Sequence, residues 1–257
     1  GFGADLGAEK FLDIKCPYGD LKPKAIVLVA TIRALRHHGG AKKEAYNTSD
    51  LNLVSKGFEN LEKHIENCKK FGIIPVVAIN LFPTDSQEEI RYVQDRCAAM
   101  DVKAVVSDGF ANGGNGTTAL AQVVVDIIAG GTNVYHKLYD WNLPVEEKIL
   151  TIAKEIYGAD GVDYSAKAKA QLKTIQSLGF DKLPVCIAKT QKSFTDNENK
   201  IGRPRNFNIT VREFEFAAGA GFVIPIVGEI MRMPGLPPVP ASEGMDIDAE
   251  GNVFGLS

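Results

Sequence analysis

The chain has 257 residues, of which 45% are hydrophobic, 24% charged and 8% aromatic. These are ordinary proportions for a globular protein and exclude a wholly disordered chain. Its 29 Lys and Arg residues against 32 Asp and Glu residues give a net charge of -3, which argues against a general nucleic-acid binder because such proteins need a basic surface. The sequence contains no stretch of about 18 uncharged apolar residues, so no membrane span is predicted.

The cysteines and histidines predict no metal site. The cysteines lie far apart and form no CxxC pair, which favours reduced thiols in a cytoplasmic protein. The histidines form no HxxxH or HExxH arrangement, so no zinc site is expected. No signal peptide opens the chain. The residues concerned are Cys16, Cys68, Cys97, Cys186, His37, His38, His64 and His136.

The first two-thirds of the chain alternates strand-like and helix-like segments. Short, continuously apolar runs predict strands buried on both faces of a sheet. Ser49 or Asp50 can cap the first long helix and Gly72 can end it. The predicted strands are Ala25–Ala30 (with an extension over Ile32–Leu35), Ile73–Ile79, Val102–Val106 and Val185–Ala188. The first predicted helix runs from Ser49 or Asp50 to about Phe71, the second begins at Thr84, and the third runs from Gly116 to Ile128. Two more cover Val145–Tyr157 and Ala166–Leu178. This order implies an α/β fold with a mostly parallel sheet and helices on both faces.

The last third of the chain has a different pattern. Lys189–Phe207 is polar and predicts a long loop, which is usually functional or disordered. Ile209–Phe216 and Phe222–Val227 read as strands. The tail from Pro234 contains four prolines within seven positions, and we expect it to be extended and to wrap over the body of the protein.

Ligands of parallel α/β sheets bind where strands end and helices begin. Asn80 and Phe82-Pro83 follow the predicted strand Ile73–Ile79, and Phe110 follows the next one. The amide of Asn80 can meet a base edge, and two rings at adjacent strand ends can clamp a planar ligand. The alternative is that Phe82 only caps the sheet edge and the glycines near Phe110 only shape a turn.

Two further segments could approach a ligand. Gly1–Gly7 has three glycines, but their GxGxxxG spacing and the lack of a preceding strand make it a weak dinucleotide motif. Lys189 follows the predicted strand Val185–Ala188 and is either an anion-binding group or an ordinary solvated lysine. The sequence contains neither the phosphate-binding pattern GxxxxGK[ST] nor the GxSxG pattern of α/β-hydrolases.

Taken together, these segments resemble the formate–tetrahydrofolate ligases, also called formyltetrahydrofolate synthetases. The resemblance covers essentially the whole chain, and its long runs make it specific. The matching runs are Gly1–Phe11 (GFGADLGAEKF), Val27–Gly40 (VLVATIRALRHHGG), Val77–Pro83 (VAINLFP), Leu183–Phe194 (LPVCIAKTQKSF) and Ala217–Pro237 (AAGAGFVIPIVGEIMRMPGLP).

The resemblance also implies a domain organisation. Residues 1–62 correspond to the carboxyl-terminal remainder of a nucleotide-binding domain that is similar to P-loop NTPases. Residues 63–257 correspond to a carboxyl-terminal folate-binding α/β domain with a proline-rich tail. Family members are considerably longer, and their amino-terminal half carries the P-loop. We therefore expect this chain to be the carboxyl-terminal half and to be inactive alone.

The reaction that the resemblance implies joins formate to tetrahydrofolate through formyl phosphate, with ATP and Mg as co-substrate and a monovalent cation as a further candidate. By position, Phe2, Phe82, Pro83 and Phe110 match the folate site, and Phe110 stands where the family usually has tryptophan. Gly3, Asp5 and Asn80 match the nucleotide side of the cleft. Lys189 and Arg212 fall in family motifs without a role. The family also implies a cytoplasmic homotetramer.

Two other functions fit parts of the sequence. The missing P-loop is compatible with a non-catalytic, ligase-like module for assembly or regulation. A doubly wound sheet is compatible with a nicotinamide-dependent oxidoreductase, but the glycine spacing near Gly3 and the missing leading strand count against it. Protection from heat by folate or by NAD distinguishes these possibilities.

Overall fold

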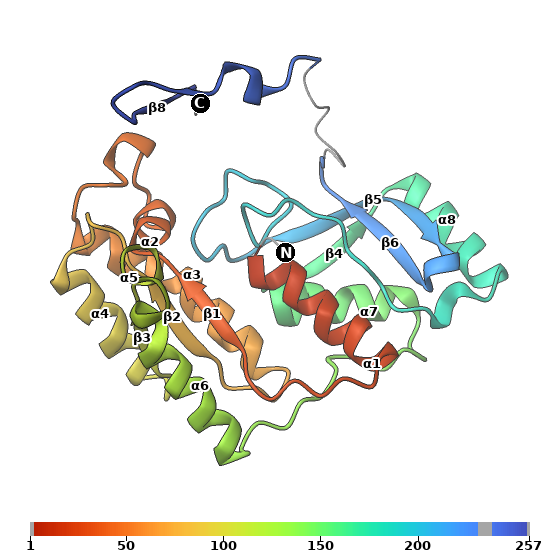
Figure 1. Cartoon of the computed structure of the whole chain (residues 1–257). Helices are drawn as coiled ribbons and strands as arrows, with labels where there is room; N and C mark the ends of the chain where they lie inside the picture. Colours follow the sequence, from red (N-terminus) through yellow and green to blue (C-terminus); the bar gives the residue numbers. More distant parts are fainter. Residues whose placement is uncertain (1–2, 231–237, 256–257) are drawn as a thin grey trace.

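The computed structural model of the chain describes residues 3–230 and 238–255. Within these residues, two sheets with packed helices make up the body, and a small hairpin lies near the carboxyl terminus (Figure 1). The strands are β1 (Val27–Ala30), β2 (Val76–Asn80), β3 (Ala104–Ser107), β4 (Gly161–Tyr164), β5 (Asn208–Ala217), β6 (Phe222–Val227), β7 (Asp246–Ile247) and β8 (Val253–Phe254). The helices are α1 (Cys16–Tyr18), α2 (Ile32–His38), α3 (Leu51–Lys69), α4 (Gln87–Ala98), α5 (Gly109–Asn112), α6 (Thr118–Gly130), α7 (Val145–Ile152) and α8 (Ala166–Ser177).

The first sheet is parallel, as the alternation of segments predicts, and has the order β1-β2-β3. Its helices begin at capping side chains. The Asp50 carboxylate accepts hydrogen bonds from the first amides of α3, and Ser86 with Glu89 forms a capping box at α4. Thr31 caps α2, so the predicted continuation of the first strand over Ile32–Leu35 is wrong.

Burial differs between neighbouring strands of this sheet. Strand β2 is buried on both faces over Val76–Ile79, as expected. Strand β1 is not, because the side chains of Val27 and Val29 are 42% and 64% exposed while Leu28 faces the core. The core on the Leu28 side packs β1 and β2 against α2, α3 and α4, through residues such as Phe58 and Ile90.

The second sheet is mixed. Strands β4 and β5 are parallel, whereas β5 and β6 form an antiparallel pair. The predicted strand Val185–Ala188 is reduced to two isolated bridges, which join Val185 and Ala188 to β6. Three π-helical or α-helical segments near the amino terminus, Gly3–Ala8, Phe11–Lys15 and α1, contribute residues to the same core as α7 and α8. The chain is therefore an α/β protein with one parallel and one mixed sheet.

Helix α6 packs against β2 and β3, but none of its residues is buried. Its sequence is almost wholly apolar, and Val125 and Ile128 are more than two-fifths exposed. No helix within residues 3–230 and 238–255 combines the length and apolarity needed to cross a bilayer. Helix α6 is therefore an apolar surface element of this chain.

The structure bears on the expected domain boundary and on the expected extended tail. The expected division between residues 62 and 63 falls inside α3, which is continuous. Of the proline-rich tail, Pro234 and Pro237 lie outside the described residues. Residues 238–255 do not form one extended segment but a 3-10 turn and the β7–β8 hairpin, and nearly all of them are exposed.

Candidate functional site

Two aromatic side chains follow neighbouring strands at one edge of the parallel sheet. Asn80 ends β2 opposite Ser107, which ends β3, and the Leu81 amide donates to the Ser107 carbonyl oxygen at 3.0 Å. Phe82 stands on the loop that leaves β2, and Phe110 stands in the short helix α5 that follows β3. Phe82 is half-buried, whereas Phe110 is 95% exposed. A single exposed ring is common on protein surfaces, so the position of both rings after neighbouring strand ends, and not exposure alone, makes them candidates. Phe82 and Phe110 together are called the aromatic platform below.

One face of the Phe82 ring is already covered. The Arg33 guanidinium carbon lies 5.2 Å from the ring centroid, a cation–π contact. Arg33 follows β1 and Phe110 follows β3, and these strands flank β2 on opposite sides. The segments that carry Arg33 and Phe110 therefore leave the sheet edge on opposite sides of the Phe82 loop. Arg33 makes no hydrogen bond or ion pair within the described residues 3–230 and 238–255.

A cavity of about 330 Å³ lies on the Arg33 side of Phe82. His37 and Tyr46 form its far wall, where the Tyr46 hydroxyl and the His37 Nδ1 are 2.6 Å apart. The cavity is lined by Thr31, Arg33, Ala34, His37, Tyr46 and Phe82. Sequence analysis did not select Arg33 or Tyr46, although Arg33 lies only three residues beyond the end of β1 and two beyond Thr31, which caps α2.

The loop that carries Phe82 and the exposed Pro83 is fixed by local hydrogen bonds. The Phe82 amide donates to the Asp85 Oδ2 at 2.9 Å, and the Asp85 amide donates to the Phe82 carbonyl oxygen at 3.0 Å. Burial raises the pKa of the Asp85 carboxyl. Phe110 lies in α5, and the segment around it is closed by the Asp108 amide, which donates to the Gly116 carbonyl oxygen at 3.0 Å.

The residues expected on the nucleotide side are split between two places. Gly3 lines two adjoining cavities of about 120 and 310 Å³, together with His38, Asn60 and His64. Asn80 lines neither of them and stays at the end of β2 with the folate candidates. Phe2, which the sequence places with Phe82, lies outside the described residues.

Asp5 is buried and paired with a lysine. Its Oδ2 lies 3.3 Å from the Lys189 Nζ, and both side chains are at most 5% exposed. The same Nζ donates to the carbonyl oxygens of Thr190 and Ser193 and lies 4.9 Å from the Tyr157 ring centroid. Burial lowers the pKa of Lys189. Of the two alternatives for Lys189, the solvated one is therefore wrong, and its ammonium group already has protein partners.

Two histidines line the cavities near Gly3. The His38 Nδ1 accepts a hydrogen bond from the Gly202 amide at 3.1 Å, and burial with the neighbouring His37 lowers the pKa of His38 to about 4. Burial also lowers the pKa of His64, whose ring lies against Phe194. Both imidazoles are therefore neutral near pH 7 and act as hydrogen-bonding groups rather than as cations.

The buried carboxyl groups do not form a metal site. Burial and the charge of Asp13 raise the pKa of Glu9, and burial raises the pKa of Asp13 to about 7. In the part of the chain that the structure describes, no three His, Cys, Asp or Glu side chains are grouped to hold a metal ion. All four cysteines are free thiols.

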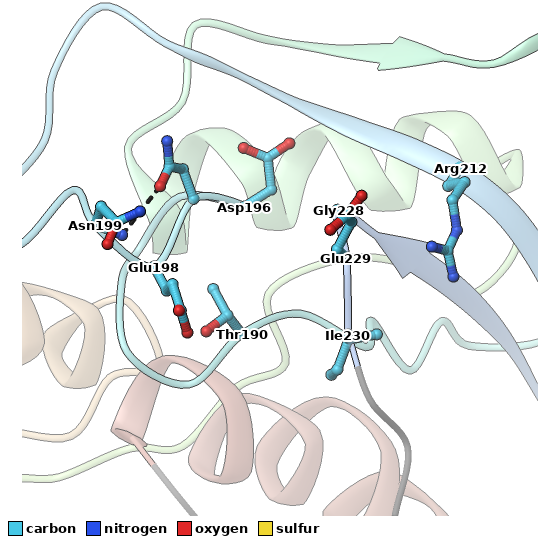
Figure 2. Close-up of a pocket in the computed structure, with 9 residues that line it drawn as sticks. Thr190, Asp196, Glu198, Asn199, Arg212, Gly228, Glu229 and Ile230 are labelled. Carbon is cyan, nitrogen blue, oxygen red and sulfur yellow. Dashed lines mark hydrogen bonds between the residues drawn. The ribbon is translucent and has the colours of Figure 1, made fainter.

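A larger cavity of about 930 Å³ lies beside the carboxyl end of β6 (Figure 2). Figure 2 shows that it is bounded by Asp196, Glu198 and Glu229, with Arg212 on the neighbouring strand. None of the residues that sequence analysis selected for folate or nucleotide lines it. Arg212 has a place in the structure but gains no role from it.

The fold is that of an α/β protein in which two aromatic side chains, Phe82 and Phe110, follow the carboxyl ends of parallel strands, the usual position for ligands in such sheets. Comparison with protein families identifies which one. The formate–tetrahydrofolate ligase family matches residues 1–257, and the chain belongs to this family. The family joins formate to tetrahydrofolate in one-carbon metabolism and uses ATP as co-substrate. The resemblance drawn from the sequence is confirmed.

Proposed function

We propose that this chain supplies the folate pocket of a formate–tetrahydrofolate ligase, with Phe82, Pro83, Phe110 and Phe2 lining it. The observation that carries the proposal is the pair of rings at adjacent strand ends, one half-buried and one fully exposed. The flat pteridine ring inserts between the open face of Phe82 and Phe110. Stacking of this kind contributes about 0.5–1.5 kcal/mol beyond simple burial.

The chemistry of the reaction explains what this pocket must do. Phosphorylation by ATP converts formate into formyl phosphate, an activated acyl donor, and the folate amine then attacks its carbonyl carbon. A rigid stack fixes the amine relative to the acyl donor, and such positioning is a large part of catalysis in reactions of this type. The pocket is therefore a substrate-positioning device, and no residue of this chain is proposed to transfer a proton.

The phosphate-binding machinery is proposed to lie outside this chain. The sequence has no GxxxxGK[ST] motif, and the described residues offer no metal cluster for Mg, so no step is assigned to a metal here. Residues 1–62 supply part of the nucleotide side through Gly3 and Asp5, and Asn80 at the end of β2 is the third proposed contact. Alone, the chain is proposed to bind folate without completing the reaction; a monovalent cation is a further proposed requirement of the complete enzyme.

We further propose that the complete enzyme is a cytoplasmic homotetramer, as the family suggests. Exposed apolar side chains support an interface on this chain, because monomeric proteins seldom leave many of them in water. They lie on β1 and α6 and include Val27, Val29, Val125 and Ile128.

Calorimetric titration of the chain with tetrahydrofolate tests the proposal. We expect saturable binding that Phe82→Ala weakens without loss of folding. Phe11→Ala is the matched control, because Phe11 is 39% exposed and lies in the amino-terminal helical segment away from the platform. Binding of NAD without binding of tetrahydrofolate would instead support an oxidoreductase. Equal binding by wild type and Phe82→Ala would remove Phe82 from the site.

A further inference from the structure

A single buried arginine connects the elements around the Phe82 platform. Arg36 lies on α2 and is 0% exposed. Its Nε and Nη2 donate to Glu89 on α4 at 2.9 and 2.6 Å, a two-pronged ion pair. Its remaining donors reach two loops: Nη1 donates to the Tyr46 carbonyl oxygen at 2.7 Å, and Nη2 donates to the Thr84 carbonyl oxygen at 3.2 Å.

Glu89 completes the same network from the other side. Its Oε1 accepts from the Asp50 amide at 3.0 Å, which fixes the start of α3. Its Oε2 accepts from the Ser86 amide and hydroxyl at 3.1 and 2.8 Å, which fixes the start of α4. Burial alone raises the pKa of Glu89, but the hydrogen bonds from Arg36, Asp50 and Ser86 outweigh burial and lower this pKa to about 2. Glu89 is therefore charged at neutral pH.

The two carbonyl groups held by Arg36 belong to the two segments that carry Tyr46 and Phe82, which line one cavity. Tyr46 forms one wall of the cavity beside Phe82, and Thr84 lies two residues beyond Phe82 on the loop that carries the ring. We infer that Arg36, together with Glu89, is a positioning residue for folate binding: the pair fixes the distance and angle between the Tyr46 wall and the Phe82 ring. The inference rests on the proposed function of the platform.

The chemistry of the pair favours this role over a purely stabilising one. Burying two charges costs desolvation free energy that their attraction only partly offsets, and apolar replacements of similar volume are often neutral or stabilising. What an apolar pair cannot supply is the directed hydrogen bonding of a guanidinium to four fixed acceptors. Replacing both residues by apolar ones should therefore preserve the fold but release the two loops.

The test uses the double variant Arg36→Met/Glu89→Leu and the single variant Arg36→Lys in the full chain. Each is titrated with tetrahydrofolate, and its melting temperature is recorded. We expect the double variant to stay folded and to bind about two- to tenfold more weakly, which is the range that loss of one aromatic stack gives. Arg36→Lys should bind with an intermediate affinity, because it keeps the charge but loses the planar fork.

A double-mutant cycle separates positioning from general stability. If Arg36 acts through Phe82, then adding Phe82→Ala to the double variant should weaken binding by less than it does in the wild type. Lys148→Met is the matched control: Lys148 is equally buried and donates to the carbonyl oxygens of Asp181 and Leu183, away from the platform. It should change the melting temperature but not the affinity.

The outcomes are distinguishable. Wild-type affinity in a folded double variant, or strict additivity with Phe82→Ala, overturns the positioning role and leaves the folate site standing. Failure of the wild type to bind tetrahydrofolate, or indifference of binding to Phe82→Ala alone, overturns the proposed function and this inference with it. If the double variant does not fold, then Arg36→Lys and its cycle with Phe82→Ala decide the question by the same criteria.

Discussion

The guanidinium of Arg33 lies 5.2 Å from the centroid of the Phe82 ring and covers one face of it. Arg33 follows β1, Phe82 follows β2 and Phe110 follows β3, so the segments that carry Arg33 and Phe110 leave the sheet edge on opposite sides of the Phe82 loop. Under the proposed function, the pteridine ring stacks on the face of Phe82 that Arg33 does not cover.

Removing the Arg33 guanidinium should weaken the binding of tetrahydrofolate to the Phe82 ring. We expect Arg33→Ala to lower the affinity for tetrahydrofolate by about two- to fivefold, the equivalent of a partly exposed cation–π contact of about 0.5–1 kcal/mol. Calorimetric titration of Arg33→Ala and Arg33→Lys measures the effect, and the lysine variant should lie between alanine and wild type. Equal affinities in all three proteins would show that Arg33 does not support the ring.

Enlarging the exposed ring should have the opposite effect. Phe110 is 95% exposed, so Phe110→Trp creates no clash and should leave the melting temperature unchanged. The larger indole offers more stacking area, and we expect it to bind tetrahydrofolate more tightly, by up to about tenfold.

Phe110→Ala is the counterpart and should bind more weakly than the wild type. Both variants are titrated with tetrahydrofolate under the same reducing conditions. A tryptophan variant that binds no better than alanine would mean that Phe110 does not contact the pteridine.

The sequence predicts that Phe82 and Phe110 follow neighbouring strand ends, because this placement is local to each strand. The apolar runs locate β2 and β3, and parallel strands end at one edge, so the segments that carry the two rings leave the same edge. Their role in folate binding stays a prediction. The same method fails where contacts are remote. Arg36 and Glu89 are 53 residues apart, and charged side chains are usually exposed, so no local pattern predicts that both are fully buried.

The remaining differences have similar causes. Val27 and Val29 are as apolar as the residues of β2, but no residue within 3–230 and 238–255 fully covers their side of β1, so their apolar character predicts more burial than the structure has. Val185–Ala188 has the composition of a strand, yet it contributes only two bridges to β6. Lysine is a residue type that is usually exposed, which favours a solvated Lys189. The side chain is instead buried beside Asp5, which lies 184 positions earlier in the chain.

Variants of the buried Asp5–Lys189 pair measure how much Asp5 contributes to the stability of the fold. Removing one member of a buried pair leaves an uncompensated charge, so Asp5→Ala should lower the free energy of unfolding by about 3–5 kcal/mol. Adding Lys189→Met removes the unpaired buried ammonium group and should restore part of the lost free energy of unfolding. Urea unfolding measures both.

ATP titration of the same variants examines the proposed nucleotide contact. If the double variant regains stability but binds ATP more weakly than the wild type, Asp5 serves the nucleotide as well. A single variant as stable as the wild type would contradict the burial of the pair.

Acid should destabilise the protein through His38. Its pKa falls from 6.5 to about 4 on folding, so between these values the unfolded chain binds more protons than the folded one. Stability from this group is present above pH 6.5 and is lost as the pH falls towards 4, with a slope of at most about 1.4 kcal/mol per pH unit. His64, whose pKa is also lowered, acts in the same direction.

His38→Asn isolates the contribution of His38, because Asn can accept the Gly202 hydrogen bond but does not titrate. We expect its free energy of unfolding, measured in urea across this window, to fall less steeply with acid than that of the wild type. Asp13 opposes the trend: its pKa rises to about 7 on folding, so it stabilises the folded state as acid is added. That contribution is common to both proteins and cancels in their difference. A His38→Asn profile parallel to the wild type would show that the pKa of His38 does not change on folding.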